Sequence, residues 1–82
     1  MGEAGHDLHS LFPGEEAILH ALKMEDARFR DLALRKHELE AEIQRIESGQ
    51  DAASDERVES LKKQRLLLLD EIAAMIAARK VE

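Results

Sequence analysis

The sequence predicts an all-α fold dominated by an antiparallel two-helix coiled-coil hairpin, with helices over about 26–48 and 55–79 and a shorter helix over about 13–23 before them. Three observations favour this fold. Of the 82 residues, 37% are charged and 44% apolar but only 2% aromatic, a composition typical of long amphipathic helices. Apolar residues alternate by three and four in both long segments, and the small polar stretch GQDAASD separates them.

The short helix is predicted from the residues around Pro13, because proline suits a first helical position. Glu15 and Glu16 would lie near the positive end of its dipole. The preceding residues contain two glycines and little periodicity, so we expect 1–12 to be a flexible tail and 13–82 to be a single domain. The apolar patch of this helix would consist of Ile18, Leu19 and Leu22.

Capping residues set the limits of the two long helices. Asp26 can accept hydrogen bonds from free N–H groups at the start of the first, and Gly49 supplies a stop after Ser48. Ser54, followed by two acidic residues, opens the second. The two helices would therefore be joined by a short loop and could fold back on each other.

One apolar stripe on each long helix predicts the hairpin seam. If the helices run antiparallel, the stripes match layer by layer, because the paired position numbers have a constant sum: 46 with 58, 43 with 61, 39 with 65, 36 with 68, 32 with 72 and 29 with 75. Flanking charges fit the same register, with Glu40 near Lys62 and Arg35 near Glu71. The predicted hairpin core comprises Phe29, Leu32, Leu39, Ile43, Ile46, Val58, Leu61, Leu68, Ile72 and Met75.

Two cations, Lys36 and Arg65, interrupt the seam in adjacent layers. In one interpretation their methylene stems cover Leu68 and Leu39 while the charges reach solvent, with Glu40 one turn from Lys36. In the other they form a polar layer that fixes register or oligomeric state. The sequence leaves both interpretations open.

The four consecutive leucines 66–69 predict a second apolar surface, because they point in nearly all directions around a helix. Leu68 belongs to the seam, but a second stripe lies on the flank of the same helix. Either the N-terminal helix or another protomer must cover it, and we favour a homo-oligomer, most simply a dimer that forms a four-helix bundle. The predicted self-association residues are Leu66, Leu69, Ala73 and Ile76.

No group of residues in the sequence indicates catalysis, so we expect a protein that is not an enzyme and uses no cofactor. The chain has 0 cysteines, and its serines occupy tail, cap and outer helix positions. Glu38, Glu40 and Glu42 are interpreted as a solvated helix face. His6 and His9 have the spacing of a metal pair but no third ligand, so no metal site is predicted either.

The net charge of −6 argues against general binding to nucleic acid, which is an unlikely partner, or to anionic membranes. A local basic patch is the possible polyanion contact and gives an alternative function, a nucleic-acid- or ribosome-associated factor. With neither a signal-like start nor a long apolar run, we expect a cytoplasmic protein without membrane contact. The leading hypothesis is an interaction or regulatory module with an unidentified protein partner. The basic patch comprises Arg57, Lys62, Lys63 and Arg65.

Two segments resemble the YdcH-like family of small bacterial proteins. They are FPxxxxIxxxLKxxDxRFxxLxxxxxELExEIxRIE, residues 12–47, and SDERVESLKKQRLxLxDEI, residues 54–72. The resemblance implies a short helix plus a helical hairpin in a bacterial cytoplasm, and no activity, because the family has no known function. Two departures stand out: Lys36 occupies a position where the family usually has His, and Leu69 one where Lys is common. The first weakens any histidine-based role and the second strengthens the apolar stripe.

Overall fold

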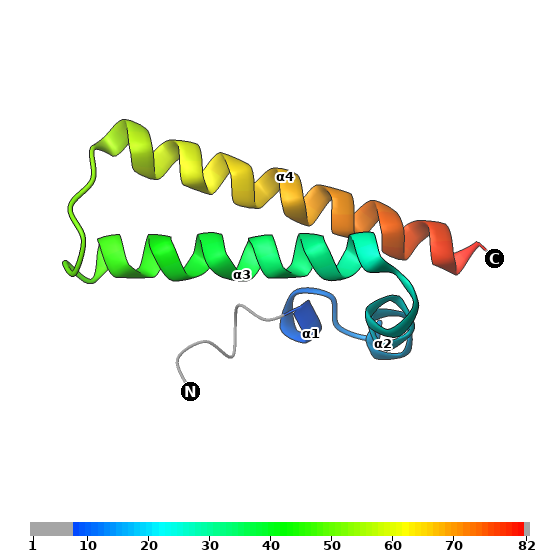
Figure 1. The fold of residues 1–82 in the computed structure, drawn as a ribbon. Helices are drawn as coiled ribbons and strands as arrows, with labels where there is room; N and C mark the ends of the chain where they lie inside the picture. The colour runs from blue at the N-terminus through cyan, green and yellow to red at the C-terminus, as the bar shows by residue number, and fades with distance from the viewer. Residues whose placement is uncertain (1–7, 82) are drawn as a thin grey trace.

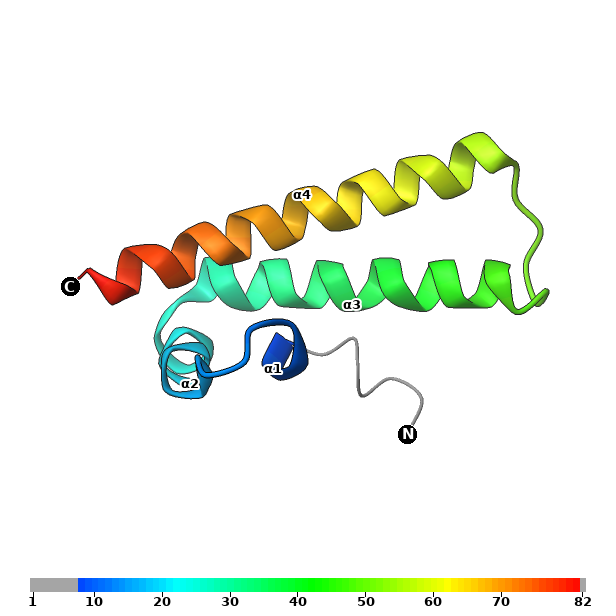
Figure 2. The ribbon, with the colours of Figure 1, turned by 180° about the vertical axis from the view of Figure 1, so that it is seen from behind.

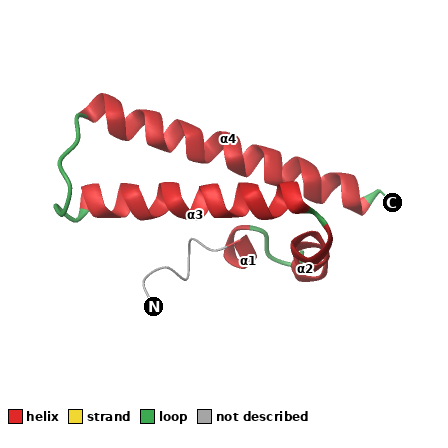
Figure 3. Ribbon diagram, viewed as in Figure 1, coloured by secondary structure: helices red, strands yellow, loops and turns green. Residues whose placement is uncertain are grey.

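The computed structural model describes residues 8–81, and all regular structure in that range is helical. The elements are α1 (Leu8–Leu11), α2 (Glu16–Glu25), α3 (Ala27–Glu47) and α4 (Asp55–Lys80). The long helices α3 and α4 run side by side in opposite directions, as Figure 1 and the reverse view in Figure 2 show. The short helices α1 and α2 lie on one side of this pair, and α2 packs where α3 begins and α4 ends (Figure 3).

A single residue, Asp26, separates α2 from α3. Its backbone is extended, with φ −122° and ψ 111°, and its N–H donates to the Leu22 carbonyl at the end of α2. Its side chain accepts a 3.0 Å hydrogen bond from the Phe29 N–H in the first turn of α3. Asp26 therefore ends one helix and caps the next, and its predicted role as an N-cap is confirmed.

The helix predicted over 13–23 begins later than expected, at Glu16. Pro13 and Gly14 instead occupy the centre of a turn in which the Glu15 N–H donates to the Phe12 carbonyl at 3.3 Å. Gly14 has φ +84°, which is the conformation a type II turn requires at its third residue, after proline. This backbone is incompatible with a helix starting at Pro13, so α2 is displaced to 16–25.

The predicted tail, 1–12, differs from the structure over its last residues. Residues 1–7 lie outside the described range, but Leu8–Leu11 form the single turn α1. Leu8 and Phe12 are partly buried and pack against the main core cluster. These apolar contacts attach residues 8–12 to the domain, because removing such side chains from water stabilises the turn.

The loop between α3 and α4 begins and ends as its capping residues predict. At Gly49, φ is +88°; its N–H donates to the Ile46 carbonyl, while the Gln50 N–H donates to that of Arg45. These are the two hydrogen bonds of a Schellman motif, which ends a helix with glycine. At the other end, Ser54 Oγ accepts from the Arg57 N–H at 3.1 Å and caps α4.

Candidate functional site

The main core lies where three helices meet. Leu19 and Leu22 of α2 pack against residues of both long helices, and Ile72, at 0% exposure, is at its centre. Towards the loop, Ile43 and Leu61 are also buried, and within residues 8–81 the helices that meet there are α3 and α4. The buried members of the predicted hairpin core are Phe29, Leu32, Ile43, Leu61 and Ile72; the partly buried members are Leu39, Ile46, Val58, Leu68 and Met75.

The predicted self-association stripe is not one continuous exposed surface. Ile76 is only 4% exposed and belongs to the core cluster with Leu19 and Leu22, so α2 covers it within one chain. Leu69 is partly buried, whereas Leu66 and Ala73 are exposed. For Ile76, the cover is therefore the N-terminal helix and not another protomer. This covering removes Ile76 from any surface that could contact a second chain.

Lys36 does not lift its charge into solvent. Its side chain is 5% exposed and its Nζ lies 2.9 Å from Oε1 of Glu40, whose side chain is 17% exposed. A cation so far withdrawn from water requires such charged or polar partners, because an unpaired buried charge is strongly destabilising. The two interrupting cations therefore differ: Lys36 is buried within an ion pair, while Arg65 is only partly buried.

Ion pairs join α3 to α4 along their flanks, but not the pairs that were predicted. Lys62 pairs with Glu47 at 3.1 Å instead of Glu40, and Glu71 pairs with Arg28 instead of Arg35. The reason is local competition, since Glu40 and Arg35 each have a partner one turn away on α3: Lys36 for Glu40, and Asp31 for Arg35. Each observed partner lies seven residues from the predicted one, so it is on the same face of α3.

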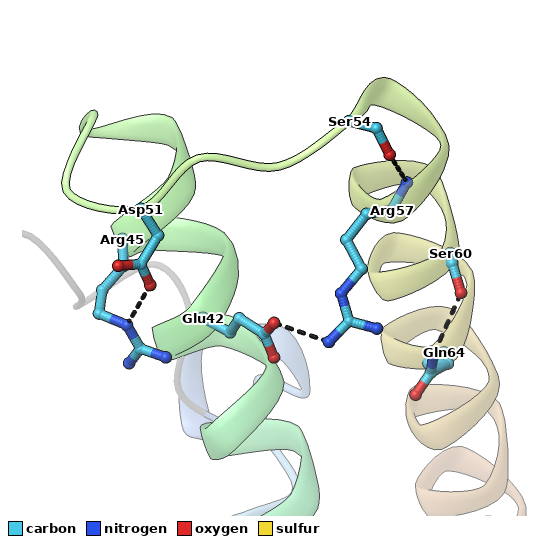
Figure 4. A network of polar contacts seen from close by, with 7 residues as sticks. All are labelled: Glu42, Arg45, Asp51, Ser54, Arg57, Ser60 and Gln64. Carbon is cyan, nitrogen blue, oxygen red and sulfur yellow. Dashed lines mark hydrogen bonds and ion pairs between the residues drawn. The ribbon is translucent and has the colours of Figure 1, made fainter.

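Part of the predicted polyanion patch is engaged within the chain. Arg57 points from α4 to α3 and donates to Glu42 at 2.8 Å (Figure 4), and Lys62 pairs with Glu47. Lys63 and Arg65 form no ion pair with another residue of 8–81. The four side chains therefore do not present one uncompensated cationic surface.

An exposed surface runs along the side of α4 that faces away from the core. Leu66 and Leu67, 58% and 62% exposed, occupy its middle, with Lys63 one turn before them and Asp70 one turn after. Because these positions recur at spacings of three and four, they share one side of the helix. We name this surface the α4 outer face, and it comprises Lys63, Leu66, Leu67, Asp70, Ala73 and Ala74.

Two open hollows flank the α3–α4 pair. One, of about 640 Å³, follows the groove between these helices, where Leu39, Leu67 and Leu68 line it together with polar and charged side chains. The other, of about 630 Å³, lies between α1, the end of α2 and the first half of α3. We name this second one the α1–α3 hollow; it is lined by Leu8, His9, Leu19, Lys23, Phe29, Arg30, Ala33, Lys36, His37 and Glu40. Sequence reasoning missed it because its walls come from three separate helices.

The histidines do not assemble a metal centre in the part of the chain that the structure describes. His6 lies outside that part, and His9, His20 and His37 are exposed. No three His, Cys, Asp or Glu residues within 8–81 are grouped as ligands for a metal ion. Among the described helices, none has the length and apolar character needed to cross a membrane.

Comparison with known proteins places the chain in a family. No curated protein and no solved structure matches it. A family profile, described as Protein of unknown function (DUF465), matches residues 29–76, which span most of α3, the loop and most of α4. Since this match covers more than half of the 82 residues, the chain belongs to the DUF465 family.

Proposed function

We propose that the protein is a non-enzymatic protein-interaction module in which α3 and α4 form a coiled-coil hairpin and the α4 outer face binds a second copy of the chain. The resemblance to YdcH-like proteins is more specific than the DUF465 match and overlaps the matched residues 29–76. We retain it as part of this proposal. The supporting observation is the exposure of the consecutive residues Leu66 and Leu67 on α4. Adjacent exposed leucines with apolar neighbours are a typical basis for association.

The charges around these leucines favour a second copy as the partner. Lys63 and Asp70 lie on either side of the leucine pair, and neither forms an ion pair with another residue of 8–81. In a two-fold antiparallel arrangement of two α4 helices, Leu66 would pack against the partner's Leu67. Lys63 would then lie opposite the partner's Asp70, twice per dimer, so the surface is complementary to itself.

Charge exchange combined with sedimentation tests this pairing. At about 50 μM, an interface of micromolar affinity should be largely occupied, so the wild type should sediment as a dimer. Lys63→Asp alone should raise the dimer dissociation constant about tenfold, because two opposite-charge contacts become two repulsions. Asp70→Lys alone should do the same. The double exchange Lys63→Asp with Asp70→Lys should restore dimerisation, since opposite charges again face each other.

Leucine variants provide the control. Leu66→Glu combined with Leu67→Glu should give a folded monomer with unchanged helicity, whereas Leu34→Ser, at an exposed leucine of α3, should leave the dimer intact. A wild-type monomer at this concentration would refute self-association through the α4 outer face. A dimer insensitive to both single charge variants would refute the antiparallel arrangement.

The nucleic-acid alternative has weaker support. Arg57 and Lys62 are paired with Glu42 and Glu47, and the chain carries a net charge of −6. Polyanion binding requires uncompensated cations, and its affinity decreases steeply with salt. Salt-dependent retardation of RNA or DNA that disappears when Lys63 and Arg65 are replaced by Ala would support this alternative instead.

A further inference from the structure

The α1–α3 hollow combines an apolar wall with cations at its rim. Leu8 and Ala33, both partly buried, line the hollow together with the buried Leu19 and Phe29. The volume of about 630 Å³ is within the range of sites that enclose small organic molecules. The hollow can therefore accommodate an apolar body larger than an inorganic ion.

The rim is positively charged although the protein as a whole is acidic. Lys23 and Arg30 line the hollow and form no ion pair within residues 8–81. Among the lining residues in 8–81, Glu40 is the one carboxylate, and it is bonded to Lys36 at 2.9 Å. Within residues 8–81, Lys23 and Arg30 thus have no ion-pair partner, which favours an anionic group at this position.

Arg30 is also held in place. Its guanidinium donates a 2.9 Å hydrogen bond to the Lys23 carbonyl, one of the free carbonyls at the end of α2. This bond fixes the guanidinium beside Lys23 and leaves its other N–H groups available as donors. A carboxylate or phosphate oxygen is the acceptor that suits such a fork.

We propose that the α1–α3 hollow binds a small amphipathic anion, with its carboxylate or phosphate at Lys23 and Arg30 and its apolar chain against Leu8 and Ala33. His9 and His37 line the same hollow. The groove hollow of similar volume is a poorer site for such a ligand, because Glu38 and Glu42 line it beside Arg35. This binding is independent of the α4 outer face, so either proposal can fail alone.

Nuclear magnetic resonance titration of the full chain tests the proposal with defined probes. Sodium octanoate and octyl phosphate share the anionic group and apolar chain, and the stronger of the two identifies the head group. Each should shift the amide signals of Phe29, Ala33 and His37 and leave those of Leu67 and Gln64 unchanged. Octanol and octylammonium, which lack the anion, should bind at least tenfold more weakly. Equal shifts with all four probes would refute anion recognition, and no shifts would refute the site.

Variants separate ligand binding from folding. Ala33→Leu should narrow the hollow and abolish the octanoate-induced shifts, and circular dichroism with a thermal melt should show that the variant stays folded, since leucine also favours a helix. Lys23→Gln with Arg30→Gln should weaken binding about tenfold. The matched control, Arg35→Gln with Lys63→Gln, removes two cations on other surfaces and should leave binding unchanged. If the control pair weakens octanoate binding equally, the effect depends on net charge alone, and the proposal is overturned.

Discussion

Near the start of α3, three helices share one core, whereas near the loop α3 and α4 are the two helices of residues 8–81 that face each other. At the first end, α2 adds Leu19 and Leu22 to the side chains around Ile72 and Ile76. At the loop end, Ile43 and Leu61 are buried but their neighbours Ile46 and Val58 are only partly covered. The apolar burial that stabilises the fold is thus concentrated where α2 packs.

The loop end depends more on capping and charge. Ser54 caps α4, Arg45 pairs with Asp51 at 3.0 Å, and Arg57 reaches across to Glu42 (Figure 4). Exposed ion pairs contribute little to stability, because water already solvates both partners. We infer that the loop end is the less stable of the two, and the following predictions test that difference.

The largest expected effect is at the three-helix end. Ile72→Ala should reduce the free energy of unfolding by about 4 kcal/mol, because Ile72 is fully buried and contacts from α2 and α3 would be lost. Ile46→Ala at the loop end should cost about 1.5 kcal/mol, since that side chain is already partly in water. Urea denaturation at one fixed protein concentration measures both. Equal losses would contradict the inferred difference between the ends.

A smaller effect is expected at the Lys36–Glu40 ion pair. Glu40→Gln should cost about 3 kcal/mol, because the buried ammonium loses the negative charge of Glu40 beside it. Lys36→Met should be neutral or stabilising, since methionine fills similar space without a charge to desolvate.

The combination of these two variants is the control for the ion pair. Adding Lys36→Met to Glu40→Gln should recover most of the stability lost through Glu40→Gln, as thermal unfolding would show. If Lys36→Met instead destabilises as strongly as Glu40→Gln, the pair itself stabilises the fold. If Lys36→Met instead forms a mixture of oligomeric states, that result would support the interpretation in which a polar layer specifies assembly.

The smallest effect is expected for the exposed pair at the loop end. Arg57→Gln should change the free energy of unfolding by only a few tenths of a kcal/mol, and Glu42→Gln should do the same. A double-mutant cycle on these two positions isolates their coupling energy. A coupling above about 1 kcal/mol would show that the polar network contributes substantially to the loop end.

Helix type and limits were predictable where capping chemistry is local. Asp26, Gly49 and Ser54 each act within one turn, so the limits predicted for α3 and α4 lie within one residue of those observed. The DUF465 match covers the same two helices and fits the suspected relationship to a small uncharacterised family. The repeat of three and four similarly predicted that α3 and α4 pack against each other.

The N-terminal errors have a common origin in turn chemistry. Pro13 suited a helix start, but the dipeptide Pro13–Gly14 is also the signature of a type II turn, and the positive φ of Gly14 decides between them. The spacing of Leu8, Leu11 and Phe12 by three and four was a weak signal for α1. A single turn has too little periodicity to make that signal decisive.

The candidate sites were harder to predict because they depend on tertiary packing. Nothing in the sequence distinguishes a Lys36 that reaches solvent from one buried beside Glu40, since both conformations leave Glu40 one turn away. The covering of Ile76 depends on the orientation of α2 relative to α3, which the φ and ψ angles of Asp26 set. The roles of the α4 outer face and of the basic patch stay predictions.

The single-residue junction at Asp26 also has a consequence for motion. Because only one residue separates α2 from α3, α2 can leave the core as a rigid unit about this position while α3 and α4 stay packed. Such local opening costs only the contacts of the short helices, which is less than global unfolding. It would uncover Ile76 beside Ala73 and Leu69 and so complete the apolar stripe that the closed chain interrupts. The junction thus couples the position of α2 to the length of the apolar stripe that α4 exposes.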